Sequence, residues 1–319
     1  MKLWFRSLTV VAAVLGVATT TAAAQGAFPQ RDVELVVPYS AGGSVDGMAR
    51  AFAKAFGAAL GRDAIVQNRD GGGGVIGVNA VRNAPADGHT ILFSPATPLT
   101  QVPFLTGNVP YTLDDFHPVC QLFENPFVIA VREESPLRSL EHLLEQAKAR
   151  PGSLSFGHAG IGSVPHLATA SLAKASGVTF NEIAFRGDAQ VIPQVLGGHV
   201  DFGSLGASTV AGKPLRVLAS LGNQRIDAFP DAPAVTEFGV KHAIIARNGL
   251  YVSSKVPAEV RARLEAACLE ASRNPEFLEA AKRQFQQVTY MDADAYRKQL
   301  QSDYQANEEL IRSLGLAAK

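Results

Sequence analysis

VELVVPYSAGGSVDGMARAFAKAFGAALG, residues 33–61, joins a valine-rich run to a helical pattern through a turn of glycine and serine. The first part, residues 33–38, is short, apolar and β-branched, which indicates a strand. Beyond residue 43 the larger apolar residues recur every three or four positions, as on one face of a helix: Met48, Phe52, Ala55, Phe56 and Leu60. Strand, turn and helix in this order form the repeating unit of an open α/β sheet, so the stretch predicts that fold class.

The same alternation continues along the chain. Strand-like runs at residues 64–68 and 89–94 enclose a glycine run and a short helical pattern, and a proline-rich connection follows. A second series of strand and helix patterns begins at residues 126–131 and ends with the strand-like run 215–220. Two similar α/β units in series predict two lobes, each an open α/β sheet, with a cleft between them.

The last part of the chain has a different pattern. After a strand-like run at residues 249–254 it is largely helical, and such a segment often folds back onto the first lobe. We therefore expect two strands that cross between the lobes, near residues 120–130 and 243–253. The expected division is a first lobe of residues 25–124 and 248–319 and a second lobe of residues 125–247.

The first residues predict export. Lys2 and Arg6 flank the start of an apolar run, and Ala22-Ala23-Ala24 supplies an A-x-A cleavage site. The run is too short for a membrane span. Residues 1–24 are therefore interpreted as a signal peptide that is cleaved after Ala24.

The net charge of the mature chain excludes two classes of partner. Without residues 1–24 the chain keeps 27 Lys and Arg against 29 Asp and Glu, a net charge of about −2, so no nucleic acid or anionic membrane surface is expected as a partner.

An exported compartment permits a disulfide between Cys120 and Cys268, the two cysteines of the chain. The spacing alone does not decide whether they are bridged, because the two Cα atoms must come within reach.

The stretch NRDGGGGVIG, residues 68–77, contains a G-x-G-x-x-G pattern. In a dinucleotide site the strand that follows ends in an acid that binds the ribose, but here that strand ends in Ser94 and Pro95. Asp87 precedes the strand in a turn, and the pattern follows the second strand of its unit rather than the first. A dinucleotide is therefore disfavoured, no cofactor is expected, and a flexible turn into a helix remains an alternative.

Two further loops share this chemistry: residues 38–47, PYSAGGSVDG, and residues 157–167, GHAGIGSVPHL. Each follows a predicted strand and opens a predicted helix. The N–H groups at a helix start bind anions, and glycine lets the backbone approach the ligand closely. Three such loops at the carboxyl ends of strands predict a small anionic ligand in the cleft.

Little in the chain favours an enzyme. It contains no G-x-S-x-G, H-E-x-x-H, P-loop or C-x-x-C motif, and its seven histidines lack metal-ligand spacing. The pair that comes closest to a catalytic nucleophile with its general base is Ser163 with His166. An exported hydrolase is therefore the remote alternative, and no catalytic or metal-binding residue is expected.

The chain resembles the Bug-type receptors, the periplasmic solute-binding proteins of tripartite tricarboxylate transporters. VPYSAGGSVD stands where that family typically has VPFPPGGSTD, and NRDGGGGVIG stands where it has NRPGAGGNIG. In the second half, SFGHAGIGSVPHLA is similar to YASAGNGSTSHLA, and AFRGDAQVIPQVLGGHVDF to PYKGSAPALTDLLGGQVDF. The resemblance spans nearly the whole mature chain in the right order.

The resemblance implies a two-lobed periplasmic binding protein of type II-like fold, monomeric and located in the periplasm. Such a receptor closes on a carboxylate-bearing metabolite, such as a di- or tricarboxylate, and delivers it to membrane subunits of the transporter. An amino acid or other zwitterion remains an alternative ligand, and a signalling partner remains an alternative to the transporter.

The resemblance also implies the site residues. One ligand carboxylate is expected against the loops after the first two strands, held by backbone N–H groups and the Ser44 hydroxyl. These first-lobe residues are Ser40, Ala41, Gly42, Gly43, Ser44, Asp46, Gly72, Gly73 and Gly74. Asp46 is also suited to a purely structural role at the helix start.

The second lobe is expected to hold the distal end of the ligand through His158, Gly160, Gly162, Ser163, Arg186 and Asp188. Arg186 has the chemistry for a bidentate carboxylate contact or for a surface position. Asp188 stands where the family commonly has small or hydroxylic residues, and its charge would repel a second carboxylate and favour an ammonium group. The pattern leaves two positions open for Arg247 and Asn248, which either face the cleft or lie at a surface hinge.

Overall fold

The computed structural model describes residues 28–185, 187–241 and 243–318. The expected signal peptide and Arg186 therefore lie outside the described residues. Among the helices that are described, none is both long and apolar enough to cross a membrane.

The first sheet has six strands in the order β11-β4-β10-β3-β1-β2. β1 pairs in parallel with β2 and β3, whereas β10 and β11 run antiparallel to their neighbours. The strands are β1 Val33–Val37, β2 Ala64–Asn68, β3 Thr90–Pro95, β4 Phe116–Asn125, β10 Ala246–Ser253 and β11 Gln287–Met291.

Helices cover both faces of this sheet. On one face lie α1 Ser44–Leu60, α9 Ala258–Ser272 and α10 Pro275–Arg283, and on the other lie α2 Val75–Arg82 and α11 Ala293–Ser313. Successive residues of β1 point to opposite faces, so Leu35 packs in the core under α1 and Val36 in the core under α2 and α11. Burial on both faces explains why this strand is apolar at nearly every position.

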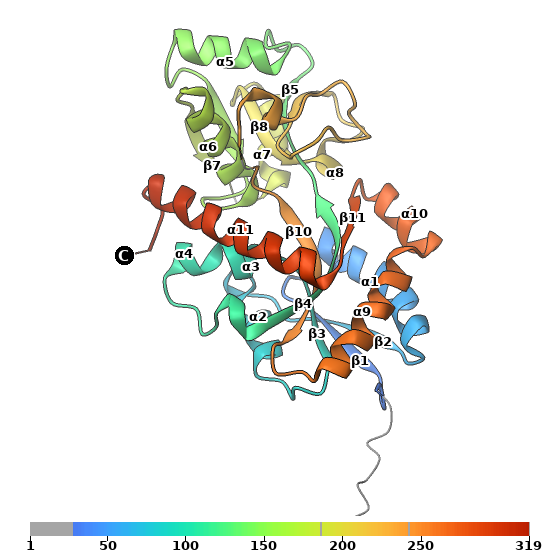
Figure 1. The fold of residues 1–319 in the computed structure, drawn as a ribbon. Helices are drawn as coiled ribbons and strands as arrows, with labels where there is room; N and C mark the ends of the chain where they lie inside the picture. The colour runs from blue at the N-terminus through green and yellow to red at the C-terminus, as the bar shows by residue number, and fades with distance from the viewer. Residues whose placement is uncertain (1–27, 186, 242, 319) are drawn as a thin grey trace, which may run out of the picture.

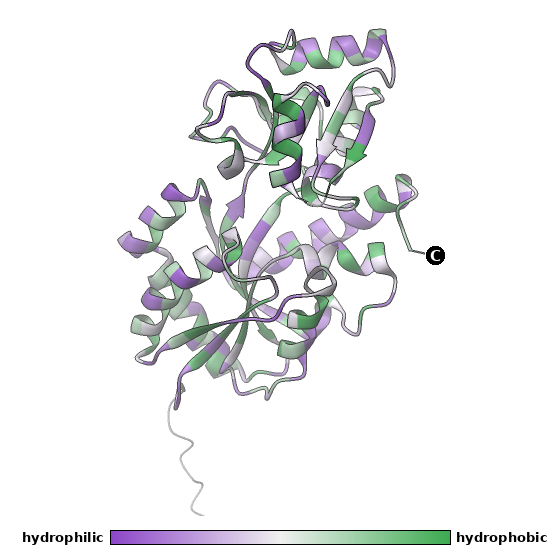
Figure 2. Cartoon of the chain, turned by 180° about the vertical axis from the view of Figure 1, so that it is seen from behind, coloured by the Kyte–Doolittle hydropathy of each residue, from purple (hydrophilic) through white to green (hydrophobic). Residues whose placement is uncertain are grey.

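The second sheet has five strands in the order β7-β6-β8-β5-β9. They are β5 Phe127–Arg132, β6 Ser155–His158, β7 Asn181–Ala184, β8 Phe202–Gly206 and β9 Leu215–Ser220. One face packs on α5 Leu140–Ala149 and α6 Val164–Ser176, and the other on α7 Asp188–Leu196 and α8 Ala207–Val210. In Figure 2 hydrophilic and hydrophobic residues alternate along the outer helices, as this one-sided burial requires.

Two passages of the chain join the lobes. The chain leaves the first sheet at Asn125 and enters the second at Phe127, and it returns between β9 and β10. Figure 1 shows the two lobes connected at these strands, with α11 lying across them. The end of α11 packs into the second lobe through Leu310 and Ile311.

The predicted fold class is confirmed: two α/β lobes form, each around its own sheet. Several elements differ from the sequence-based expectation. β11 lies within the segment expected to be helical, and α3 Thr97–Thr100 and α4 Val102–Thr106 lie within the expected proline-rich connection. β11 is short, and its pairing with β4 joins segments more than 150 residues apart, so no local pattern reveals it.

Cys120 and Cys268 form a disulfide, with their Cα atoms 6.7 Å apart. Cys120 is in β4 and Cys268 in α9, and both are fully buried in the core beneath α1. The bridge therefore ties the helical return segment to the centre of the first sheet.

We expect replacement of both cysteines by alanine to lower the free energy of unfolding by about 2–5 kcal/mol, because the bridge closes a long loop in the unfolded chain. Urea unfolding of the oxidised protein, the reduced protein and the double variant measures the loss. Equal stability of the oxidised protein and the double variant would contradict a stabilising bridge.

Candidate functional site

The loops after β1 and β2 lie side by side because the two strands are parallel neighbours. Ser40 Oγ donates a hydrogen bond of 2.6 Å to the Asp70 carboxylate and joins the two loops. A Cβ atom at Gly77 would lie 2.8 Å from Pro38 Cα, so α2 approaches the first loop closely only because residue 77 is glycine. The third glycine of the nucleotide-like pattern thus serves helix-to-strand packing.

The start of α1 has open backbone donors. Its N-cap residue is Gly43, and no side chain caps the helix. Among the described residues, no hydrogen bond engages the N–H groups of Ala41 and Gly43, and both residues are exposed. The positive end of the helix dipole lies at the same place. The predicted donors Ala41 and Gly43 are therefore free to bind an anion.

Asp46 has structural partners in this loop. Its carboxylate accepts hydrogen bonds from the Gly42 N–H at 2.9 Å, from Arg50 at 3.1 Å and from Asn68 at 3.0 Å. Burial alone would raise the pKa of Asp46, but the bonds from Arg50, Gly42 and Asn68 outweigh it and hold the pKa below its ordinary value. The Gly42 N–H is thus already hydrogen-bonded within the protein. Asp46 stabilises the loop in the conformation that leaves the N–H groups of Ala41 and Gly43 open.

The corresponding loop of the second lobe is held by two histidines. The Gly162 N–H donates to His166 Nδ1 at 2.9 Å, and His166 Nε2 lies 3.0 Å from Glu182 on β7. His158 Nδ1 donates to the Gly160 carbonyl at 3.0 Å. The predicted Gly162 donor is therefore already used within the protein.

These histidines lie beside Glu182, and the three side chains form one group. His158, His166 and Glu182 offer atoms within 4.8 Å of one another. His166 Nδ1 accepts from the Gly162 N–H, so Nε2 carries the ring proton and donates it to Glu182. The rings of His158 and His166 also stack, with their centroids 4.5 Å apart and an angle of 19° between their planes. In this structure the hydrogen bonds of His166 connect the Gly162 loop to Glu182 on β7.

Ser163 caps α6, its Oγ accepting from the His166 backbone N–H at 3.4 Å. The His166 ring is engaged by Gly162 and Glu182 instead. Among the described residues the nucleophile–base hydrogen bond of a hydrolase is therefore not formed between this pair.

Asp188 lies half-buried at the start of α7. Its carboxylate accepts from the Gly206 N–H at 2.8 Å and from Thr209 Oγ at 3.2 Å. Burial raises the pKa of Asp188, and these two hydrogen bonds offset part of that rise. Asp188 thus connects α7 to the turn between β8 and α8. A contact of Asp188 with the ligand remains a prediction.

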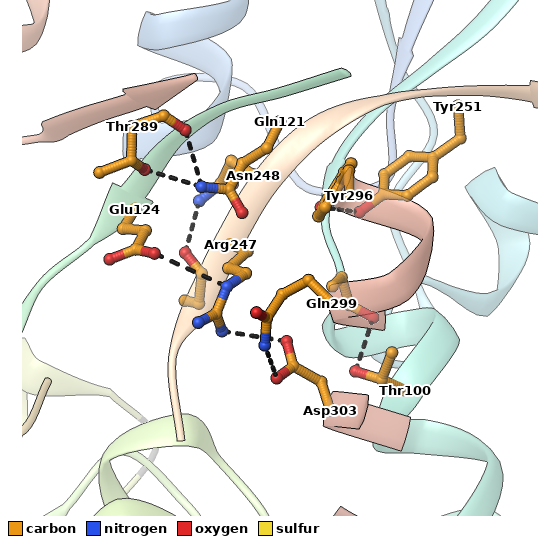
Figure 3. Close-up of polar contacts among 12 residues, drawn as sticks. Thr100, Gln121, Glu124, Arg247, Asn248, Tyr251, Thr289, Tyr296, Gln299 and Asp303 are labelled. Atoms are coloured by element: carbon orange, nitrogen blue, oxygen red, sulfur yellow. Dashed lines mark hydrogen bonds and ion pairs between the residues drawn. The ribbon is translucent and has the colours of Figure 1, made fainter. Parts of the chain in front are cut away.

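A polar cluster around the buried Arg247 and Asp303 lies where β10 meets β4, shown in Figure 3. Arg247 Nη1 donates to Asp303 on α11 at 3.0 Å, and Arg247 Nε lies 3.6 Å from Glu124. Gln299 donates to the same Asp303 carboxylate at 2.8 Å. Burial raises the pKa of Glu124 in this environment. We call Arg247, Glu124, Asp303 and Gln299 the crossing cluster. Arg247, 3% exposed, thus belongs to the junction between the lobes.

A cavity of about 990 Å³ lies between the lobes, lined by residues 224–228 of the second lobe and by α10 and β11 of the first. Gln286 lines it and donates to Ser44 Oγ at 3.2 Å, so the cavity adjoins the start of α1. Gln287 donates across it to the Arg225 carbonyl at 3.3 Å. Gln286 lies in no recognisable sequence motif, so the sequence did not identify it as a candidate site residue.

The predicted residues thus fall into two groups. The structure brings together the first-lobe loops that contain Ser40–Ser44 and Gly72–Gly74. It brings together His158, Gly160, Gly162 and Ser163 at the ends of β6 and α6. That both groups contact one ligand remains a prediction.

Comparison with known proteins covers both lobes. A model of the family described as Tripartite tricarboxylate transporter family receptor, TctC, matches residues 48–316. Protein BugT of Bordetella pertussis is 35% identical over 244 residues, which cover 73% of this chain and 75% of BugT. The crystal structure of a TctC solute-binding protein from Polaromonas is 32% identical with a TM-score of 0.81, covering 90% of this chain and 99% of that one. The structure of the periplasmic binding protein BugD is 28% identical with a TM-score of 0.73, covering 92% and 100%.

We expect R247M to lower the free energy of unfolding by about 3–5 kcal/mol, because the buried Asp303 would lose the hydrogen bond and the positive charge of Arg247. The double variant R247M/D303L should recover part of the loss. R312M, which removes an exposed partner of Glu308, is the control and should cost at most about 1 kcal/mol. Urea unfolding measures all three, and a loss for R247M as small as that for R312M would contradict a structural role of the crossing cluster.

A second prediction concerns pH. Burial, assisted by the neighbouring His166, lowers the pKa of His158. The neutral ring therefore stabilises the fold above about pH 6.5, and this contribution is lost as the pH falls through the lower pKa of the folded state.

We expect H158N, which keeps a donor for the Gly160 carbonyl, to lose less stability than the wild type between about pH 7 and pH 5. H199N serves as the control. Urea unfolding across this range tests the idea, and parallel curves for wild type and H158N would refute it.

Proposed function

This chain belongs to the tripartite tricarboxylate transporter receptor family of solute-binding proteins, and we propose that it captures a small carboxylate-bearing metabolite for such a transporter. The ligand binds between the two lobes, which close on it, and the closed receptor delivers it to the membrane subunits. The receptor acts as a monomer, and residues 1–24 direct it to the periplasm.

The observation that carries this proposal is the open donor set at the start of α1. Ala41 and Gly43 are exposed, and their N–H groups, at the positive end of a 17-residue helix, have no hydrogen-bond partner within the described part of the chain. Asp46 holds the loop in place, and a carboxylate is one of the anions that such a site binds. Backbone donors recognise any carboxylate, so they support the ligand class and not one compound.

Exposed apolar side chains support closure. Ile161, on the second-lobe loop, is 65% exposed, and Ile76, in the first turn of α2, is 57% exposed. Large apolar residues on two candidate binding loops lose contact with water if the lobes close over a ligand. Closure therefore gains free energy from these residues beyond the contacts with the ligand itself.

A zwitterion is the second candidate ligand. Asp70 is exposed and has Ser40 as its hydrogen-bond partner, which places a carboxylate beside the proposed anion site. An ammonium group on the ligand would be attracted to Asp70, whereas a second ligand carboxylate would be repelled. Amino acids are therefore included with organic acids in the tests below.

A thermal-shift screen of organic acids and amino acids tests the receptor proposal, because a ligand raises the melting temperature according to its concentration relative to Kd. Mass spectrometry of the incubated ligand must recover it unchanged. X-ray scattering should show a smaller radius of gyration in the complex. Chemical conversion of the stabilising compound, or binding without compaction, would refute the receptor or its closure respectively.

We expect G43A to weaken carboxylate binding by about tenfold, equivalent to about 1.4 kcal/mol, because a methyl group would crowd the open N–H groups. The fold should tolerate the change, since the nearest atom to the new Cβ is Ser40 O at 3.6 Å. G222A is the matched control, a glycine in the other lobe with its nearest atom at 3.4 Å. Calorimetric titration compares them, and equal affinities would place the carboxylate elsewhere.

A further inference from the structure

A cluster of charged side chains surrounds His117, the second residue of β4. β4 and β3 both run antiparallel to β10, so β4 has the same direction as β1, β2 and β3. The first residues of β4 therefore lie at the end of the sheet opposite to the loops that follow β1 and β2. The cluster is thus separate from the proposed carboxylate site.

β4 forms the edge of the sheet at His117. β11 pairs with β4 only at residues 121–124, so among the described strands none covers this side of residue 117. α9 and α11 pack on opposite faces of the sheet, and each places one arginine at this edge. Arg261 Nη1 lies 3.0 Å from His117 Nδ1, and Arg297 Nη2 lies 2.6 Å from the same atom.

The two guanidinium groups share one neutral acceptor. Glu265 accepts from His117 Nε2 at 3.0 Å, so Nε2 carries the ring proton and Nδ1 has the lone pair. Burial, together with the charges of Arg261 and Arg297, lowers the pKa of His117 against the opposing effect of Glu265, and the ring stays neutral. Two positive charges thus meet at one lone pair, where they repel each other.

Most N–H donors of the two guanidinium groups remain available. In the described part of the chain neither Arg261 nor Arg297 makes a further side-chain hydrogen bond or an ion pair. Both side chains are partly exposed, and none of their unpaired nitrogen atoms is buried. A guanidinium group has several N–H donors, so each can keep its bond to His117 and bind an oxyanion with the others.

A small cavity lies at this point, with a volume of about 80 Å³. One water needs about 10–15 Å³ of such space, so the cavity admits a small ion with a few waters and excludes a larger metabolite. Its polar lining consists of His117, Arg261, Arg297, Asp114, Ser254 and Gln301. Ser254 and Gln301 supply a hydroxyl and an amide donor. Asp114 is exposed, and within the described residues no ion pair joins it to either arginine.

We propose that this cavity binds a free tetrahedral oxyanion, phosphate or sulfate, held by the guanidinium groups of Arg261 and Arg297. A phosphate group carries a charge of about −1.5 to −2 at pH 7, which matches two adjacent cations. The bound anion replaces the repulsion between the arginines by attraction to a common partner. It thereby connects α9 and α11 at the edge of β4 and stabilises the folded first lobe.

Calorimetric titration with inorganic phosphate, in chloride buffer of constant ionic strength, measures the binding. R261Q and R297Q should each weaken it at least about tenfold, because each removes a charged donor. D114N should tighten it by about threefold, because it removes a negative charge from the lining. R312Q changes an exposed arginine of α11 that does not line the cavity, and this control should keep the wild-type affinity.

Nuclear magnetic resonance of the His117 ring tests where the phosphate binds. The ring signals, identified by their absence from H117N, should shift with phosphate, and the pKa of His117 should rise because an anion favours the charged ring. G43A should show the same shift, which separates this cavity from the open N–H groups of α1. Glycerol 3-phosphate should bind at least about threefold more weakly than phosphate, because the cavity has no room for the glyceryl group.

Absence of phosphate binding by the wild type overturns the inference, and so do equal affinities of the wild type, R261Q and R297Q. A shift of the His117 signals that G43A abolishes also overturns it, because the effect would then arise at α1. Tighter binding of glycerol 3-phosphate than of phosphate overturns the free ion as the occupant. The wild-type measurements stand even if an arginine variant fails to fold, and none of these outcomes decides the receptor proposal.

Discussion

Parallel pairing of β1 with β2 and β3 is the constraint on which the first lobe depends. Parallel neighbours end at the same edge of a sheet, so the loops after β1 and β2 must meet there, and the helices that follow must start there. The hydrogen bond between Ser40 and Asp70 and the close contact of Gly77 with Pro38 both follow from this arrangement. The open N–H groups of α1 are thus a product of topology as much as of local sequence.

The junction of the lobes depends on a different interaction. Arg247 carries a buried charge at the point where β10 leaves the second lobe, and its partners come from β4 and from α11. Since α11 also packs into the second lobe through Leu310 and Ile311, one helix contacts both lobes and the crossing strands. A rotation of the lobes must be accommodated around this cluster, because separating its charges would cost several kcal/mol.

Much of the fold could be predicted because its signals are local. The apolar period of α1, the valine-rich β1 and the glycine turns each lie within one short segment, and the structure has these elements within a few residues of their expected bounds. β11 was missed because its signal is its pairing with the distant β4. In the candidate site, the glycine and serine loops could be identified for the same local reason. The hydrogen bond of Ser40 to Asp70, that of Gln286 to Ser44 and that of the Gly162 N–H to His166 could not be predicted, because each depends on residues far away in the chain or on the exact turn of a loop.

The sequence by itself determined the class of fold, the order of its elements and the family, since periodicity and motif order are properties of the chain alone. It left open whether Cys120 and Cys268 are bridged and whether Arg247 faces the cleft or lies at a surface hinge. Only the tertiary structure decided both points, by bringing the two cysteine Cα atoms to 6.7 Å and by enclosing Arg247 with Asp303 and Glu124. The physical reason is that a disulfide and a buried ion pair require proximity in space, which spacing along the chain does not specify.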